Sequence, residues 1–172
     1  LREILITKEK EELLKNLILI IIPVFNADGH ERLSRFNRPN QNGPKEMGWR
    51  TTAQNLNLNR DWMKADAPEM QALLKLFTKW LPDFLIDSHT TNGADYQYDV
   101  TYGIERNQNI EEGLREWNKQ RLLPFLHKYV EEEGFLLMPY IDFKDWSAGM
   151  ESGIVDGAFG PRYSQGYAAV QN

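Results

Sequence analysis

The chain contains no cysteine, and only three of its 172 residues are histidine: His30, His89 and His127. The lack of cysteine excludes a disulfide framework and every metal site built on thiolates. A metal site would therefore use imidazole and carboxylate ligands. His127 lies in a helical pattern without a suitable partner one turn away, and His30 directly follows a turn. We interpret both as structural residues.

Long apolar runs and an excess of positive charge are also missing. No apolar run reaches the ~20 residues of a membrane-spanning helix. The net charge is -5 and the mean hydropathy is -0.57, which excludes a basic nucleic-acid-binding surface and is typical of one soluble globular domain. The sequence starts without a Met or a signal-type pattern and stops without a polar tail. We therefore expect an internal segment of a longer domain.

Apolar runs and helical patterns alternate in the first half of the chain. The run Leu17–Phe25 is β-branched and apolar on both faces, which is typical of a buried central strand. A helix is predicted to begin at Asp66, because Asp66 and Glu69 have capping-box spacing, and to end at Pro82. A second strand is then predicted over residues 83–90.

The alternation continues in the second half. A helix is predicted over residues 109–132, with a kink or break at Pro124. A third strand is predicted over residues 135–141, and a weak amphipathic helix over residues 2–15 at the start of the chain.

This order of elements predicts an α/β fold. We expect three layers, with helices on both faces of a mixed, mostly parallel sheet, and with Leu17–Val24 and Phe84–Asp87 as buried neighbouring strands. Buried parallel strands need neighbours and cover on both faces. The predicted domain, residues 1–172, is therefore expected to be incomplete at both ends.

His89 lies at the predicted carboxyl end of the second strand, in the sequence Asp87-Ser88-His89-Thr90. Ligands gather at the carboxyl ends of strands in open α/β sheets. Asp87 and His89 share one face of the strand, so Asp87 could orient the imidazole of a metal ligand. A structural histidine held by hydrogen bonds is the alternative.

Two arginines, Arg50 and Arg60, lie ten residues apart within a long segment rich in Asn, Gly and Pro. Loops of such length inside a domain are often functional. Leu and Asn alternate over residues 56–59, so that one side can anchor the segment while the other presents amides. Arginine binds carboxylates through paired hydrogen bonds, and asparagine adds a neutral donor. The segment is either a carboxylate-binding site or an ordinary polar loop.

Three segments, taken in order, resemble the carboxypeptidase A-like zinc peptidases. They are Pro23-x-x-Asn26-x-Asp28-Gly29, then Arg50 followed by Leu58-Asn59-Arg60-Asp61-Trp62, then Asp87-Ser88-His89-Thr90. The resemblance extends from about residue 17 to residue 91. It implies that the chain is part of the catalytic domain of a metallocarboxypeptidase, a zinc-dependent hydrolase that cleaves the C-terminal peptide bond of a substrate with a free C-terminus.

The resemblance also implies a role for each matching residue. His89 corresponds to the third zinc ligand, and Arg50 to the catalytic arginine that polarises the scissile carbonyl and stabilises its oxyanion. Asn59 and Arg60 correspond to the pair that binds the terminal carboxylate of the substrate. Tyr163 and Tyr167 are both candidates for a tyrosine that covers the substrate.

The sequence departs from the family pattern at several points. The first two zinc ligands of the family come from a His-x-x-Glu motif, and no His precedes His30, so the remaining ligands are expected upstream of Leu1. The general-base Glu of the family has no counterpart after Glu151. Asn57 replaces an Asp that supports a ligand in the family. We therefore expect these residues alone to bind zinc weakly and to lack peptidase activity.

Two other functions fit the same residues. One is a related zinc amidohydrolase of the aspartoacylase and succinylglutamate-desuccinylase type. The other is a metal-free module that binds carboxylates. The resemblance implies neither nucleic acid nor membrane as a partner, and a periplasmic or secreted location fits both the family and the lack of Cys.

Overall fold

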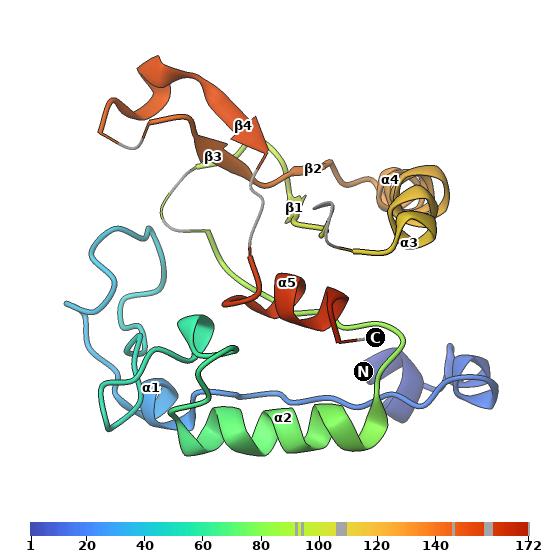
Figure 1. The fold of residues 1–172 in the computed structure, drawn as a ribbon, viewed down its shortest axis with the longest axis horizontal. Helices are drawn as coiled ribbons and strands as arrows, with labels where there is room; N and C mark the ends of the chain where they lie inside the picture. The colour runs from blue at the N-terminus through green and yellow to red at the C-terminus, as the bar shows by residue number, and fades with distance from the viewer. Residues whose placement is uncertain (92, 94, 106–109, 146, 157–159, 172) are drawn as a thin grey trace.

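The computed structural model describes residues 1–91, 93, 95–105, 110–145, 147–156 and 160–171. Helices and short strands both occur along them (Figure 1). The elements are α1 (Ala27–Glu31), α2 (Pro68–Trp80), β1 (Val100–Tyr102), α3 (Glu112–Trp117), α4 (Leu123–Glu132), β2 (Leu137–Pro139), β3 (Ile141–Phe143), β4 (Ile154–Asp156) and α5 (Ser164–Ala169). Single turns of 3-10 or π type lie at Arg2–Ile6, Glu11–Lys15, Leu58–Arg60, Asn118–Leu122 and Gly149–Ser152.

The strands form two small sheets. β1 pairs with β2 in parallel, with Val100 opposite Leu137, and β3 pairs with β4 in antiparallel fashion, with Ile141 opposite Asp156. Because α3 and α4 connect β1 to β2, this part of the chain is a small parallel β-α-β unit. The fold is thus of mixed α/β type, as predicted, and the predicted third strand is confirmed in part by β2.

The helix predicted after Asp66 is confirmed as α2. Pro68 occupies its first turn, where the missing amide hydrogen costs nothing, and Met70 and Phe77 are buried on its inner face. Leu81 adopts a left-handed conformation with φ of 41° and ends the helix directly before Pro82.

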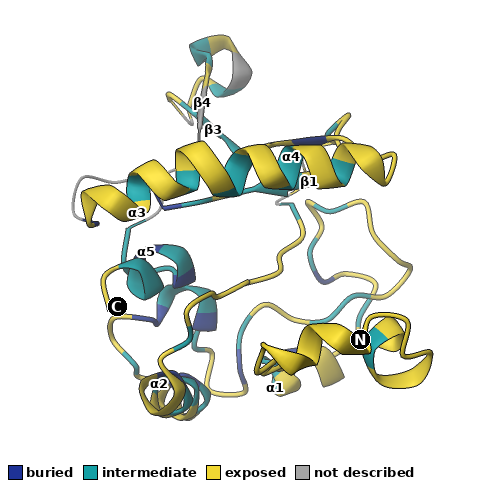
Figure 2. Cartoon of the chain, turned by 90° about the vertical axis from the view of Figure 1, so that its right-hand side faces the viewer, coloured by how far each residue is buried: buried dark blue, intermediate teal, exposed yellow. Residues whose placement is uncertain are grey.

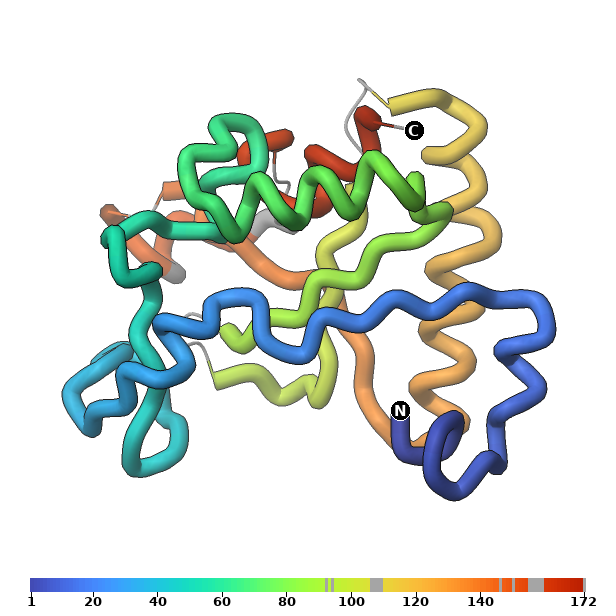
Figure 3. Tube along the Cα trace, turned by 90° about the horizontal axis from the view of Figure 1, so that it is seen from below, coloured from blue at the N-terminus to red at the C-terminus, as the bar shows by residue number. Residues whose placement is uncertain are grey.

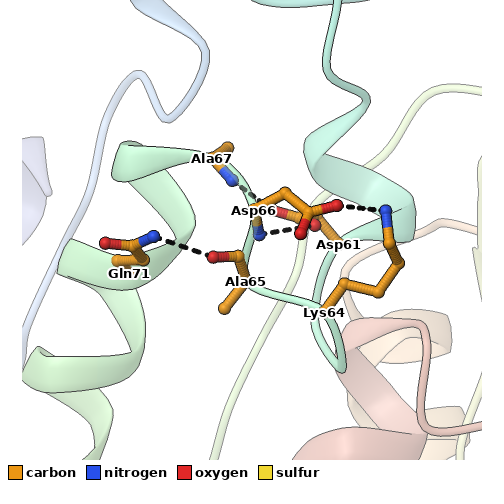
Figure 4. Close-up of polar contacts among 6 residues, drawn as sticks. All are labelled: Asp61, Lys64, Ala65, Asp66, Ala67 and Gln71. Carbon is orange, nitrogen blue, oxygen red and sulfur yellow. Dashed lines mark hydrogen bonds and ion pairs between the residues drawn. The ribbon is translucent and has the colours of Figure 1, made fainter.

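The predicted capping residue of α2 is wrong. The Asp66 side chain makes no cap hydrogen bond and instead forms an ion pair with Lys64. The cap comes from Asp61, whose carboxylate accepts hydrogen bonds from the backbone amides of Asp66 at 3.0 Å and Ala67 at 2.9 Å (Figure 4). A chain reversal between Asp61 and Asp66 therefore lets a residue outside the local pattern satisfy the start of the helix.

The main core lies where residues 56–67 meet α2 and α5. Its buried members are Leu58, Trp62, Ala67 and Met70, and Tyr167 of α5 packs against them. α5 lies beside α2 (Figure 1), and the ring centroid of Tyr167 is 6.0 Å from that of Phe77. The segment that carries Asn59 and Arg60 is therefore part of the best-packed region described.

The helix predicted over residues 109–132 is confirmed from Glu112 onward as α3, a π-type turn and α4, which run on without a break. Asn109 lies outside the described residues. The π-type turn comes directly before the Pro124 region, where proline removes an amide hydrogen bond. Most of this long helix is exposed (Figure 2), including Trp117 and Phe125 of the predicted apolar face.

The predicted strands Leu17–Val24 and Phe84–Asp87 are wrong for this structure. Neither segment pairs with another strand, and both are exposed although they are extended (Figure 3). The described residues supply neither the hydrogen-bonded neighbours nor the covering helices that a central strand needs. For the same reason, the described part of the chain shows no three-layer arrangement.

The predicted helix over residues 2–15 is also wrong as a single element. Two separate turns, Arg2–Ile6 and Glu11–Lys15, replace it, and all of their residues are at least partly exposed. Without an apolar face packed on a core, a short helix has little to stabilise it. No helix in the described ranges has both the length and the apolar character to span a bilayer.

We expect Asp61→Ala to lower the free energy of unfolding by about 2 kcal/mol, because two amides at the start of α2 lose a buried acceptor. The matched control is Asp66→Ala, which removes only an exposed ion pair and should cost at most about 1 kcal/mol. Urea unfolding followed by circular dichroism measures both values. Equal losses in the two variants would contradict the capping role of Asp61.

Candidate functional site

The turn Leu58–Arg60 is held at both ends by buried side chains. Leu58, Asp61 and Trp62 are each only 4% exposed, whereas Asn59 and Arg60 are half-buried. The alternation noted in the sequence is thus confirmed at Leu58, which anchors the turn while its polar neighbours face outward. This anchoring fixes the backbone from which the Asn59 and Arg60 side chains extend.

The Arg60 guanidinium lies against an aromatic ring. Its Cζ atom is 4.2 Å from the ring centroid of Tyr163, and its Nη1 donates a hydrogen bond of 2.7 Å to the carbonyl oxygen of Asn59. Burial lowers the pKa of Arg60 from its usual value, and the charges of Arg50 and Arg162 lower it further, while Tyr163 acts in the opposite direction. In the described part of the chain, Arg60 forms no ion pair with a carboxylate.

The two tyrosines predicted near the site have different surroundings. Tyr167 packs into the core, with its ring centroid 5.6 Å from that of Trp62. Tyr163 precedes the first turn of α5 and contacts Arg60. Arg162 also lies near the Tyr163 ring, with its Cζ 5.7 Å from the centroid. Of the two, only Tyr163 contacts a residue of the predicted carboxylate-binding pair.

His89 and Asp87 contact each other as the sequence predicts. The Nε2 atom of His89 is 2.9 Å from an Asp87 carboxylate oxygen, and about half of the His89 side chain is exposed. The hydrogen bond that His89 donates to Asp87 raises the pKa of His89, although burial and the charges of Arg60 and Arg50 oppose this. Burial acts to raise the pKa of Asp87, but hydrogen bonds from His89 and Ser164 lower it overall.

The contact with Asp87 leaves the second ring nitrogen of His89 available. In the described residues, Nδ1 has no hydrogen-bond partner, so it could bind a metal while Asp87 orients the ring. However, no group of three or more His, Cys, Asp or Glu in those residues could hold a metal ion. His89 therefore fits as one zinc ligand, and a complete ligand set is not found among the residues described.

Arg50, Arg60 and His89 are close enough for charge to act between them. Arg50 and Arg60 both act on the pKa of His89 through their charges, and Arg50 acts on Arg60. Arg50 is exposed, and its carbonyl oxygen accepts a hydrogen bond of 3.3 Å from the Asn26 side chain.

A cavity of about 350 Å³ lies away from these residues, between β1, β2 and the α3 region, where it is lined by Tyr102, Arg115 and Tyr140 among others.

The two remaining histidines have the surroundings of structural residues. His30 is exposed, with Nδ1 2.9 Å from a Glu31 carboxylate oxygen. His127 on α4 meets Tyr102 of β1 edge-on, with ring centroids 5.8 Å apart. These contacts agree with the interpretation made from the sequence.

Three contacts of the site were not predicted from the sequence: the Asn26 bond to Arg50, the Ser164 bond to Asp87, and the position of Arg162 beside Tyr163. Only Asn26 had a signal in the sequence, because it belongs to the motif that ends in Gly29. Ser164 and Arg162 come from a segment without a recognisable pattern.

Comparison with known proteins gives two results. The sequence model of the zinc carboxypeptidase family matches residues 3–129. Among curated proteins, a probable carboxypeptidase 2 from Arthroderma benhamiae is 25% identical over 139 residues, which is 76% of this chain and 24% of the relative. Carboxypeptidase 2 from Trichophyton rubrum is 24% identical over 146 residues, which is 80% of this chain and 24% of the relative.

The chain spans about a quarter of the length of these curated relatives. No solved structure matches it.

We expect the 172-residue chain to bind zinc with a dissociation constant in the micromolar range or weaker, because a catalytic zinc site needs three protein ligands and His89 is the one ligand predicted in this chain. Isothermal titration calorimetry with zinc alone measures this. His89→Ala should abolish the remaining binding, and His127→Ala should not. Tight binding of one zinc ion through three ligands of this chain would contradict the expectation.

Proposed function

Because the chain belongs to the zinc carboxypeptidase family, we propose that it supplies the substrate-binding part of a metallocarboxypeptidase that removes the C-terminal residue of peptides. The observation that carries the proposal is the environment of Arg60. Arg60 is half-buried, and its guanidinium rests on Tyr163, donates to the Asn59 carbonyl oxygen and lacks a carboxylate partner in the described residues. Burying a cation without an anionic partner is costly. The free carboxylate of a peptide substrate would satisfy it.

Asn59 and Arg60 form the proposed carboxylate site. Arginine can hold a carboxylate through two parallel hydrogen bonds, and the Asn59 amide adds a third donor. The anchored turn Leu58–Arg60 fixes the direction of approach, because its flanking residues are in the core. Tyr163, already in contact with Arg60, is the residue that we propose to cover the bound C-terminal residue.

Arg50 and His89 act on the scissile bond in this proposal. Arg50 is positively charged and exposed, and it stabilises the oxyanion that develops on the carbonyl oxygen. Asp87 holds the His89 ring so that the free nitrogen can bind the metal. When bound, zinc polarises the carbonyl and lowers the pKa of a water molecule.

The exposed apolar segments also have a place in this proposal. We propose that residues 17–24 and 84–87 become central strands of a three-layer α/β/α domain in the full-length protein. Both segments are extended and apolar, as such strands require. Their exposure in this structure gives no support to the family assignment, which rests on the sequence match over residues 3–129.

Two substitutions in the zinc-loaded full-length protein test the two roles. Arg60→Ala should raise KM for peptides with a free C-terminus by about 10- to 100-fold, with little effect on amidated peptides, because it removes a charged hydrogen-bond donor from the bound carboxylate. Arg50→Ala should lower kcat by about 100-fold, because it removes an oxyanion donor. Steady-state kinetics on paired free-acid and amidated peptides separates these effects.

Arg121→Ala is the matched control, since Arg121 is exposed on the turn between α3 and α4. Equal losses with free-acid and amidated peptides after Arg60→Ala would count against the carboxylate site. Hydrolysis of N-acyl amino acids without release of C-terminal residues would instead identify an amidohydrolase.

A further inference from the structure

The turn at Asn26–Gly29 has no role in the function proposed so far, although it is one of the three motifs in the sequence. In the structure, Asn26 makes two hydrogen bonds with different atoms of its side chain. Oδ1 accepts from the amide of Gly29 at 3.0 Å and so caps α1, while Nδ2 donates to the carbonyl oxygen of Arg50 at 3.3 Å. One side chain therefore connects the turn to the catalytic arginine of the proposal.

Two more hydrogen bonds join the same turn to residues on either side of Arg50. The carboxylate of Asp28 accepts from the amide of Ala53 at 2.8 Å, and the carbonyl oxygen of Gly29 accepts from the amide of Trp49 at 2.7 Å. The turn thus holds the backbone before, at and after Arg50. Three hydrogen bonds at Trp49, Arg50 and Ala53 fix both the position and the orientation of the backbone that carries Arg50.

The close approach of the two segments requires glycine on both sides. A Cβ atom at Gly29 would overlap the carbonyl oxygen of Trp49, and a Cβ atom at Gly48 would lie 2.6 Å from the carbonyl oxygen of Gly29. Neither position has room for a Cβ atom, because each contact would be shorter than a normal carbon–oxygen contact. The backbones therefore pack directly on each other, with no side chain between them.

Thr52 continues the connection toward the carboxylate site. It is fully buried, its amide donates to the carbonyl oxygen of Leu56 at 3.0 Å, and its hydroxyl accepts from the amide of Leu56 at 3.3 Å. Leu56 leads directly into the anchored turn Leu58–Arg60. A continuous series of backbone contacts thus runs from the Asn26–Gly29 turn, past Arg50, to Arg60.

We propose that Asn26 and Asp28 are positioning residues that set where the Arg50 guanidinium lies relative to the Asn59 and Arg60 pair. The inference rests on the proposed function, since it assigns Arg50 to the oxyanion. In the described residues, the Arg50 side chain has no ion pair of its own, so its backbone sets where the guanidinium can reach. A shift of about 1 Å in a catalytic group can cost about 100-fold in rate.

The kinetic test uses the zinc-loaded full-length protein. Asp28→Ala should lower kcat at least about 10-fold, with KM for free-acid peptides changed less than about 2-fold, because Arg60 is anchored separately by the core. Asp28→Asn keeps an oxygen acceptor for Ala53 and should restore most of kcat. Asn26→Asp keeps the cap on Gly29 but loses the donor to Arg50, so it should lower kcat like Asp28→Ala. Glu31→Ala, at an exposed neighbouring position, is the control.

A double-variant comparison distinguishes positioning from general damage. If Asp28 acts through Arg50, Asp28→Ala should cause no further loss of kcat when Arg50 is already alanine. A merely structural role would lower kcat again in that background, and this result would overturn the proposal. So would an unchanged kcat in Asp28→Ala.

Amide hydrogen exchange on the 172-residue chain gives a readout independent of activity. Asp28→Ala should increase exchange at Ala53 and Trp49, whereas Glu31→Ala should not. Unchanged exchange at both amides would overturn the link between the turn and the Arg50 segment. If the unmodified full-length protein releases no C-terminal residue, the proposed function fails, and the exchange result still decides whether the turn holds this segment.

Discussion

The buried carboxylate of Asp61 connects the candidate site to the only well-packed part of the described structure. Asp61 directly follows Arg60 in the chain, and its carboxylate accepts hydrogen bonds from the two backbone amides at the start of α2. Next to it, Trp62 packs against Tyr167 on α5, and the same helix begins beside Tyr163. Arg60 and the ring on which it rests are therefore both fixed to one core. Because that core is small, the geometry of the site depends on very few contacts.

The electrostatics of the site differ from those of the whole chain. The chain carries a net charge of -5, yet four arginines lie near one another in this region: Arg50 is near Arg38 and Arg60, and Arg162 is also near Arg60. In the residues that the structure describes, no carboxylate forms an ion pair with any of the four arginines. Such local concentration of one sign draws an anionic ligand toward the site. The rest of the surface is acidic and repels an anionic ligand.

Features set by local sequence could be predicted, and features set by distant partners could not. The helix α2 follows from its own periodicity, from Pro68 in its first turn and from Pro82 directly after its end. The strands expected at residues 17–24 and 84–87 depend on neighbours, and the described residues supply none. The sequence also could not separate Tyr163 from Tyr167, since the difference lies in which one packs on Trp62. Motif order predicted which residues form the site, but packing determined the contacts that these residues make.

The exposed run Leu17–Ile22 has a consequence for how the chain behaves at high concentration. Six consecutive apolar residues, four of them isoleucine, lie extended with side chains exposed on both faces. Among the described residues, their backbone groups have no hydrogen-bond partner. Segments with high β-propensity and no charge readily add strands from other molecules. Pro23 ends the run and stops strand pairing from extending beyond Ile22, because proline cannot donate a backbone hydrogen bond. At high concentration, this run is therefore a place where isolated chains can associate through backbone hydrogen bonds despite their acidic surface.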